Sequence, residues 1–232
     1  MRRRSKEYKL KLEKVDRNPK KLAEAVQIIL SLPKAKFEET VDLAIKLGID
    51  PKQSDQNVRG AVSLPKGTGK KVRIVVIADA DQAKKALDAG AEHAGFEDII
   101  AKIKEGWLDF DVLIATPSTM QQVRTLGKLL GPKGLMPNPK TGTVTDNVEN
   151  AVKEAKAGRV EFRIDKGACL HIPVGKISFS KEDLVENCTA VINAVIRAKP
   201  ATAKGIYLHS CSISSTMSPS VKIDINELQV TQ

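Results

Sequence analysis

Two short runs of consecutive apolar residues place the strongest constraint on the fold. They occupy 74–78 (IVVIA) and 112–115 (VLIA). A strand that is apolar at every position is buried on both faces, which is typical of a parallel sheet covered by helices on both sides. Helical patterns separate or follow these runs, over 81–95, 97–108, 118–130 and 147–158. Strands that alternate with helices in this way predict a small parallel sheet with right-handed crossovers.

Both ends of the chain show a different pattern, that of half-buried strands. Apolar and polar residues alternate over 40–47, and alternation indicates a strand with one face toward a core. Further strands are expected over 61–65, 159–165, 168–179, 205–216 and 220–228. Helices are expected over 22–30, following a cap at Asn18-Pro19, and over 181–199.

These two patterns predict the domain organisation and the fold class, which is α/β and α+β in two domains. Residues 1–67 and 160–232 are expected to form one split α+β domain. Residues 68–159 are expected to form an α/β domain inserted into it, entered through the basic, glycine-containing linker KGTGKK at 66–71.

Charge favours a nucleic-acid partner. The chain has 38 Lys and Arg against 28 Asp and Glu, a formal net charge of +10 at pH 7. Much of the excess lies before residue 37, and a second region, 112–145, holds no acid. That second region contains Arg124, Lys128, Lys133 and Lys140. Two separate basic regions favour nucleic acid over a merely solvated surface. Aromatic residues are only 3% of the chain, which argues against stacking of successive single-stranded bases.

The sequence also predicts where the protein resides. No apolar run approaches the roughly 18 residues of a membrane span, so no membrane partner is expected. The start, MRRRSKEYKLKLEKVD, is basic, but no apolar segment follows it, so we expect no export signal. Three cysteines, few and odd in number, fit buried thiols in a reducing compartment. The expected location is the cytoplasm.

A nucleotide-dependent α/β enzyme acting on a phosphorylated substrate is the main alternative. A Walker loop requires a glycine five residues before Gly69-Lys70 and a hydroxyl residue after it, but Leu64 and Lys71 occupy those positions. The first apolar strand runs into ADADQAKK, which has no glycine fingerprint for a pyrophosphate. No arrangement of the three histidines resembles a catalytic triad. We therefore predict no enzymatic activity.

A zinc site is a second alternative. Cys169 with His171, and His209 with Cys211, are each two residues apart and would lie on one face of a strand. A Cys2His2 cluster requires those two strands to be neighbours. Ordinary strand residues are the favoured interpretation, so we predict neither a metal nor another cofactor.

Two loop segments combine uncharged hydroxyl groups with exposed apolar residues. SSTMSPS (214–220) contains one methionine, and KAKFEET (34–40) contains one phenylalanine. Such groups can read the shape of a folded RNA through directional hydrogen bonds to 2′-hydroxyls and base edges. Ordinary turns remain the alternative at this point.

Four longer stretches resemble a known family. They are PKAKFEETVDLAIKLGIDPKQSDQNVRGAVSLPKGTGK, ATPSTMQQVRTLGKLLGPKGLMPNPKTGTV, RVEFRIDKGACLHIPVGK and SSTMSPSV. Together they are similar to large-subunit ribosomal protein one of the bacterial type, the family of the mobile stalk beside the tRNA exit site. The resemblance implies a split RNA-binding α+β domain and a Rossmann-like, three-layer α/β domain inserted through two strands.

The resemblance also implies a function without catalysis. It implies a structural constituent of the large ribosomal subunit that binds the stalk region of large-subunit rRNA and assists release of deacylated tRNA from the exit site. It further implies repression of translation through the protein's own operon mRNA, and a monomer when the protein is free of the ribosome.

The family's RNA-binding residues carry over onto individual positions of this chain. They are Phe37, Thr40, Ser210, Thr216 and Met217, supported by Lys36, Arg163, Lys166, His171 and Lys176. The family pattern has glycine after the Thr-Met pair, where this chain has Ser218. Serine adds a Cβ and disfavours positive φ, which predicts a less close approach of this turn to RNA. A coat protein that binds nucleic acid through charge alone remains the alternative for the mode of binding.

Overall fold

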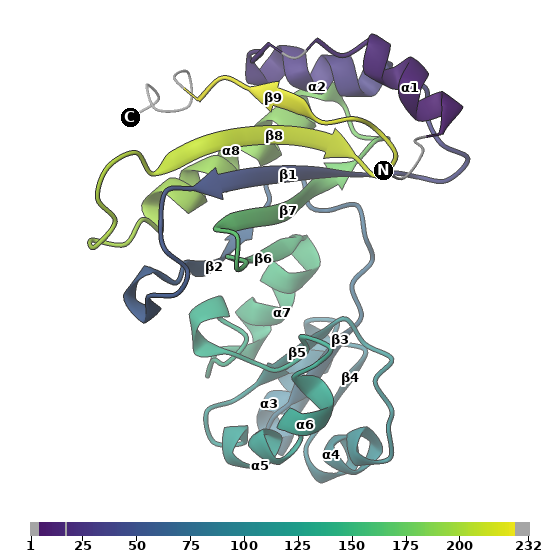
Figure 1. The fold of residues 1–232 in the computed structure, drawn as a ribbon. Helices are drawn as coiled ribbons and strands as arrows, with labels where there is room; N and C mark the ends of the chain where they lie inside the picture. Colours follow the sequence, from purple (N-terminus) through teal and green to yellow (C-terminus); the bar gives the residue numbers. More distant parts are fainter. Residues whose placement is uncertain (1–4, 17, 226–232) are drawn as a thin grey trace. The chain divides into compact units, whose positions relative to one another are not determined.

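The computed structural model describes residues 5–16 and 18–225. Contacts divide the chain into unit 1, which comprises residues 1–69 and 160–232, and unit 2, which comprises residues 70–159 (Figure 1). Each unit contains helices packed on a sheet, which agrees with the mixed α/β and α+β class expected from the sequence. None of the described helices has the length and apolar character needed to span a membrane.

Unit 1 is built on a four-stranded antiparallel sheet. Its strand order is β7 (Cys169–Lys176), β1 (Thr40–Leu47), β8 (Leu208–Ser215), β9 (Val221–Ile223). The predicted strands at 40–47, 168–179 and 205–216 are thereby confirmed. Of the strand expected over 220–228, residues 221–223 are in β9, and 226–228 lie outside the described residues.

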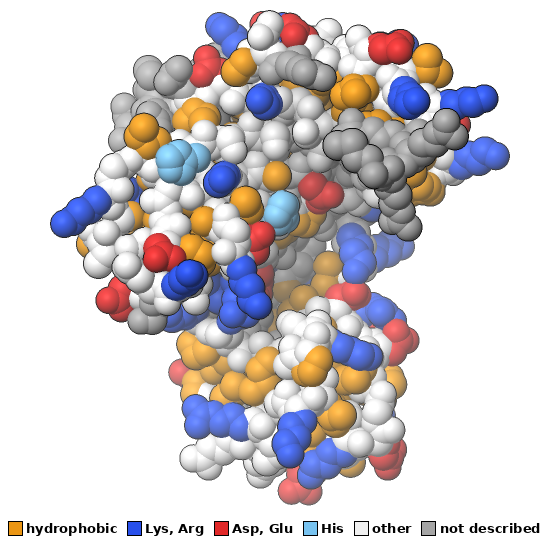
Figure 2. Space-filling model, viewed as in Figure 1, with side chains coloured by type: hydrophobic (Ala, Val, Ile, Leu, Met, Phe, Trp, Pro, Cys, Tyr) orange, Lys and Arg blue, Asp and Glu red, His pale blue; other side chains and the backbone are white. Residues whose placement is uncertain are grey.

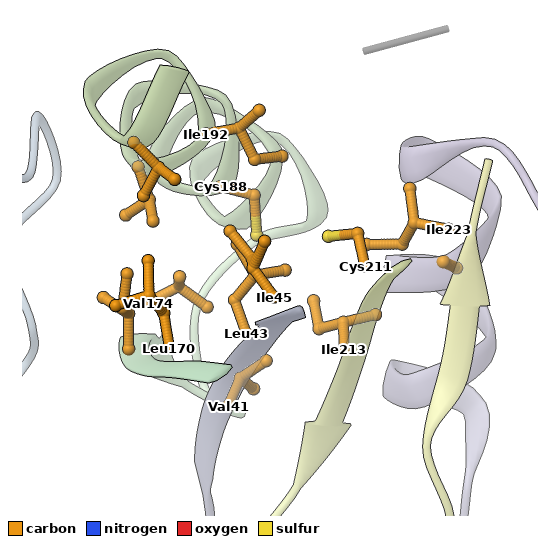
Figure 3. Packing of buried hydrophobic residues seen from close by; sticks show 14 of the residues in the cluster. Val41, Leu43, Ile45, Leu170, Val174, Cys188, Ile192, Cys211, Ile213 and Ile223 are labelled. Atoms are coloured by element: carbon orange, nitrogen blue, oxygen red, sulfur yellow. The ribbon is translucent and has the colours of Figure 1, made fainter. Parts of the chain in front are cut away.

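Two helices cover one face of this sheet, α2 (Leu22–Ser31) and α8 (Lys181–Arg197) (Figure 1). The alternate residues Val41, Leu43 and Ile45 of β1 are fully buried beneath them. Figure 3 shows these side chains packed against residues of β7, β8 and α8. The period-2 pattern of β1 thus meets the helices on one side and leaves the other side of the sheet uncovered.

The start of α2 differs from the sequence prediction. The helix begins at Leu22 with Lys21 at the cap, so the cap predicted at Asn18-Pro19 is wrong. Lys20 is instead drawn to the sheet, because its N–H donates to the Lys222 carbonyl at 3.0 Å and its carbonyl accepts from Asp224 at 2.9 Å. These hydrogen bonds to the edge strand hold Lys20 outside the helix, so α2 begins only at Leu22.

Three smaller elements complete unit 1. They are α1 (Lys6–Glu13), η1 (Ser54–Gln56) and a two-stranded sheet of β2 (Arg59–Ser63) with β6 (Arg159–Arg163). Helix α1 was not expected from the sequence. The Ser5 hydroxyl caps it by accepting a hydrogen bond from the backbone N–H of Tyr8. The arginine-rich segment before it lies outside the described residues.

Unit 2 contains the parallel sheet expected from the apolar runs. Its strand order is β4 (His93–Gly95), β3 (Ile74–Ile77), β5 (Val112–Ala115). One apolar cluster joins the sheet to α3 (Ala80–Asp88) and α7 (Val148–Ala157). A separate cluster on the other face joins it to α4 (Glu97–Lys104), α5 (Met120–Thr125) and α6 (Gly127–Leu130). The sheet therefore lies between two helical layers, as strands apolar at every position predict.

Two helical predictions in unit 2 need correction. The helix expected over 81–95 ends at Asp88, and 93–95 form the edge strand β4. The helix expected over 118–130 is divided into α5 and α6 around Leu126. The following tract, rich in Gly and Pro, is irregular as expected, with one turn of 3-10 helix, η2 (Pro139–Thr141).

Candidate nucleic-acid interface

The uncovered side of the unit 1 sheet, called here the open face, carries three of the residues singled out from the sequence, Thr40, His171 and Ser210. Its members alternate with the core residues of β1, β7 and β8 and are half-buried or exposed. They are Thr40, Asp42, Ala44, Lys46, Cys169, His171, Pro173, Ser210, Ser212 and Ser214. In Figure 2, uncharged and histidine side chains are visible on this side of the molecule, with Lys, Arg and some acidic side chains around them.

Strand register divides the predicted site residues between the two ends of the open face. Thr40 pairs with Lys176 at one end, whereas Lys46 pairs with Ser210 at the other. Thr40 and Lys46 are six positions apart along an extended strand, a distance of about 20 Å. The structure therefore places Thr40 and Ser210 on one face of the sheet but at opposite ends of it, and the predicted residues do not form one cluster.

Glu39 organises the first of these ends, called here the turn end. Its side chain is fully buried, and its carboxylate accepts hydrogen bonds from the Ala35 N–H at 2.7 Å, the Ser215 hydroxyl at 2.5 Å and the Met217 N–H at 3.0 Å. Burial alone would raise the pKa of this carboxyl, but these three hydrogen bonds and the charge of Lys11 outweigh it and hold the pKa below its ordinary value. An ionised carboxylate thus ties the 35–39 loop to the 215–218 turn.

Helix α1 is attached to the same turn through Lys11. The Lys11 side chain is 5% exposed, and its ammonium group donates to the Met217 carbonyl at 3.2 Å. A buried lysine requires a compensating partner, and here a carbonyl and the nearby Glu39 charge supply it. Both backbone polar groups of Met217 are therefore held from within the protein.

The threonines at the turn end hold each other across β1 and β8. The Thr216 hydroxyl accepts from the Thr40 N–H at 3.1 Å and lies 3.3 Å from the Thr40 carbonyl, to which it donates. The Thr40 hydroxyl accepts from the Lys176 ammonium at 3.0 Å. Since a hydroxyl that accepts can still donate, the Thr40 O–H remains able to bond an outside acceptor.

The two apolar residues of the turn end are held out into solvent. Phe37 is 53% exposed and Met217 is 54% exposed, and Lys36 beside Phe37 is exposed as well. Large apolar side chains at a rim of polar groups are typical of an interaction surface. Glu39 holds the backbone of Met217 directly and, through Ala35, the loop that carries Phe37.

Ser218 does not occupy the backbone conformation that glycine favours. Among the described residues other than glycine, positive φ occurs at Ala168 alone. The Ser218 hydroxyl accepts from the Ser215 N–H at 2.8 Å and so closes the turn. Ser218 therefore has no positive φ to strain it, and its hydroxyl stabilises the turn that carries Met217.

The predicted residues Lys166 and Ser210 lie toward the other end of the open face, whereas Arg163 ends β6 of the two-stranded sheet. Lys166 belongs to a turn in which the Asp165 carboxylate accepts from the N–H groups of Gly167 and Cys169. These backbone hydrogen bonds, chiefly that from Cys169, lower the pKa of Asp165. Arg163, Lys166 and Ser210 are exposed.

The centre of the open face is less basic than its ends. His171 faces Ala44 in register and lies 3.9 Å from the Asp165 carboxylate. Asp42 is half-buried beside it, and burial raises the pKa of its carboxyl against the opposing charges of His171 and Lys176. A phosphate would be repelled by Asp42, whereas a ribose or base edge can bond the neighbouring serine hydroxyls.

The strands that carry the cysteine–histidine pairs are not neighbours. Strands β7 and β8 lie on opposite sides of β1, and a bulge between Lys46 and Leu47 leaves His209 exposed while Cys211 is buried. Burial raises the pKa of Cys211, and that of Cys188 nearby, to about 12. No group of three or more potential metal ligands occurs within 5–16 and 18–225.

Unit 2 presents its own basic surface. Arg124, Lys128, Lys133 and Lys140 are all exposed, on α5, α6 and the irregular tract after them. The tract is held by the Asn138 side chain and backbone, which bond Lys140, Thr141 and Thr143. The second basic region seen in the sequence is therefore a surface of unit 2.

Two features of the site were not found from the sequence. Lys11 was overlooked because α1 itself was not expected. From the sequence, Glu39 is placed only in a loop. However, the alternation of β1, extended two residues back from Val41, puts residue 39 on the buried side with 41 and 43. A carboxylate at a core-facing position was the available signal, because a buried charge needs partners.

Unit 1 thus presents the open face, and unit 2 presents a surface with four exposed basic residues. A family model, that of the "Ribosomal protein L1p/L10e family", matches residues 24–219, most of the chain and parts of both units. The chain belongs to this family. It is thus a large-subunit ribosomal protein, of a structural family rather than an enzyme family. The resemblance found in the sequence is confirmed.

Proposed function

We propose that unit 1 binds the stalk region of large-subunit rRNA through its open face. The observation that carries this proposal is the Glu39 network, which joins two loops distant in sequence and leaves Phe37 and Met217 exposed between polar groups. Phosphate contacts fix the position of an RNA, and contacts to bases and riboses specify it. The turn end supplies the second kind of contact.

Charge along the open face supports the same mode of binding. Lysines lie at both ends, Lys176 at one and Lys46 at the other, and Asp42 lies between them. Phosphates are therefore expected at the ends, and riboses or base edges over the centre with its hydroxyl groups. This arrangement favours one folded RNA over polyanions in general, in contrast to a coat protein that uses charge alone.

Alanine substitution of the two exposed apolar residues tests the proposal. Phe37→Ala and Met217→Ala should each weaken binding to a stalk rRNA fragment roughly tenfold or more, since burial of one large apolar side chain contributes about 1.5 to 3 kcal/mol. Binding to a random duplex of equal length should remain unchanged. The measurement is the equilibrium Kd for both RNAs at one fixed salt concentration.

The control is Leu87→Ala, which removes a side chain of similar exposure from α3 in unit 2. It should leave both Kd values unaltered. If the Phe37 and Met217 variants lost affinity equally for the two RNAs, recognition by the turn end would be disproved and a charge-only coat protein favoured.

We further propose that the ribosome-bound protein assists release of deacylated tRNA and that the free monomer binds its own operon mRNA and represses translation. Family membership supports both roles. If one surface serves rRNA and mRNA, Phe37→Ala must weaken binding to both. The exposed basic surface of unit 2 is our candidate for contact with the tRNA.

A further inference from the structure

The end of the open face that lies opposite the turn end contains a groove, called here the strand-end groove. Its volume is about 510 Å³, and its lining includes Lys46, Gly48, Asp50, Ala168, Lys204 and His209. All these residues belong to unit 1. The basic side chains come from three segments, namely β1, the loop before β8 and β8 itself.

Three departures from regular backbone converge on this groove. A bulge between Lys46 and Leu47 breaks the pairing of β1 with β8. Ala168 has a φ of 60°, a strained value for a residue with a Cβ. Gly48 lies so close to its neighbours that a Cβ would meet the Ile206 carbonyl at 2.0 Å and His209 Nε2 at 2.9 Å. Strained backbone and bulges cluster at functional sites, where a bulge changes the direction of a side chain.

The bulge has a direct effect on His209. Regular alternation would place residues 209 and 211 on the same face, but Cys211 is buried in the core and His209 is exposed at the groove. The irregular pairing thus adds a donor to the side of the sheet that faces solvent. Gly48 makes room for this ring.

The charge of the groove is free to act on a ligand. The ion pairs of the described residues involve neither Lys46 nor Lys204 nor His209. Asp50, the acid in the lining, is partly satisfied by accepting a hydrogen bond from the Lys52 N–H at 3.0 Å. Unpaired cations around a concave surface attract an anion, and an open groove admits a polymer backbone.

Resting on the function proposed above, we propose that the strand-end groove binds phosphodiester groups of the same rRNA, through Lys46 and Lys204 with His209 as a further donor. The groove then acts as a second anchor, about 20 Å along β1 from the turn end. Two anchors at this spacing fix the direction in which the RNA crosses the sheet. The turn end selects the RNA, and the groove sets its register.

The test is a double substitution in the full-length protein, Lys46→Gln with Lys204→Gln. Kd for the stalk rRNA fragment is measured across a series of salt concentrations. Each lost phosphate contact should reduce the slope of log Kd against log salt by roughly 0.7 to 0.9, so the double variant should lose about 1.5. Affinity at low salt should fall about tenfold or more, and preference for the stalk fragment over a random duplex should persist.

A charge-matched control is Lys181→Gln with Lys153→Gln. Lys181 begins α8 on the covered face, and Lys153 lies on α7 of unit 2, so neither lines the groove. The groove proposal would be overturned if the groove variant and this control had the same affinity and the same salt slope. The proposed function would still stand, provided that the wild type prefers the stalk fragment to the random duplex. A wild type with no such preference would overturn both. Circular dichroism melting confirms that both variants fold, and Lys46→Arg with Lys204→Arg should restore the slope.

Discussion

Glu39 is the residue on which the structure of the turn end most depends. A carboxylate can accept all three hydrogen bonds from Ala35, Ser215 and Met217, whereas an amide presents a donor to at least one of these groups. Glu39→Gln should therefore lower the free energy of unfolding by about 1 to 3 kcal/mol and weaken binding to the stalk fragment. Denaturant unfolding and the Kd for the fragment measure the two effects.

The neighbouring acid provides a matched control. Glu38 is exposed and accepts one hydrogen bond, from the Ser178 hydroxyl. Glu38→Gln should change stability by a few tenths of a kcal/mol at most. Equal losses in the Glu38 and Glu39 variants would contradict the organising role of Glu39.

The same residue predicts a pH dependence. Because the folded protein lowers the pKa of Glu39, its contribution to stability is complete above the ordinary glutamate pKa and is lost as pH falls through the lower folded value. The stability difference between wild type and Glu39→Gln should therefore be constant near neutral pH and shrink below about pH 4.5. A difference that grew on acidification would have the wrong sign.

At the scale of elements, the 215–218 turn is maintained by Ser218. Ser218→Gly removes the hydroxyl that accepts from the Ser215 N–H and adds backbone freedom. We expect a loss of about 1 to 2 kcal/mol in stability and no gain in RNA affinity, because the native φ does not require glycine. Thermal melting and RNA titration check the two parts.

Ser220→Gly is the control for this turn. Residue 220 is exposed, so this substitution should change the backbone entropy of the unfolded chain alone. If Ser218→Gly instead tightened rRNA binding tenfold, close approach of the backbone would be limiting. That result would support the prediction from the sequence that Ser218 limits the approach of this turn to RNA.

Strong periodic patterns allowed most elements to be predicted. The alternation over 40–47 and the apolar run at 74–78 match β1 and β3 in position and in burial. The misses have local causes. Strand β4 has three residues, too few to show a period, and it is recognisable only through its pairing with β3. The α2 cap failed because tertiary hydrogen bonds to β9 outweighed a local capping signal.

The candidate site was less accessible to sequence reasoning than the fold. The residues at 37, 216 and 217 could be predicted as part of the site, because the family resemblance names them. The contacts that hold them could not be predicted. Lys11 contacts Met217 across 206 positions of sequence, and no residue type marks the bulge at Lys46. Contacts of that range are set by strand register and not by local pattern.

At the scale of the whole molecule, unit 1 should fold without unit 2. Its core cluster is formed entirely by residues of 1–69 and 160–232. Asn187 fixes one connection, accepting from the Lys66 N–H and donating to the Gly67 and Val174 carbonyls. A chain in which a short glycine–serine linker joins residue 69 to residue 160 should therefore melt cooperatively and bind the stalk fragment within about tenfold of the full protein.

Kd and melting temperature of this shortened chain are the measurements. This chain retains both the turn end and the groove. Weak binding by a folded unit 1 would therefore indicate that unit 2 carries the recognition of RNA. A matched chain with Asn187→Leu should fail to fix the connection and melt at a lower temperature.

The distance in sequence between Glu39 and its partners Ser215 and Met217, 176 and 178 positions, has a consequence for biosynthesis. While a ribosome is still translating the middle of the message, the emerging polypeptide has Phe37 but lacks Ser215 and Met217. If the turn end binds RNA as proposed above, a nascent chain cannot yet do so, in contrast to a finished molecule.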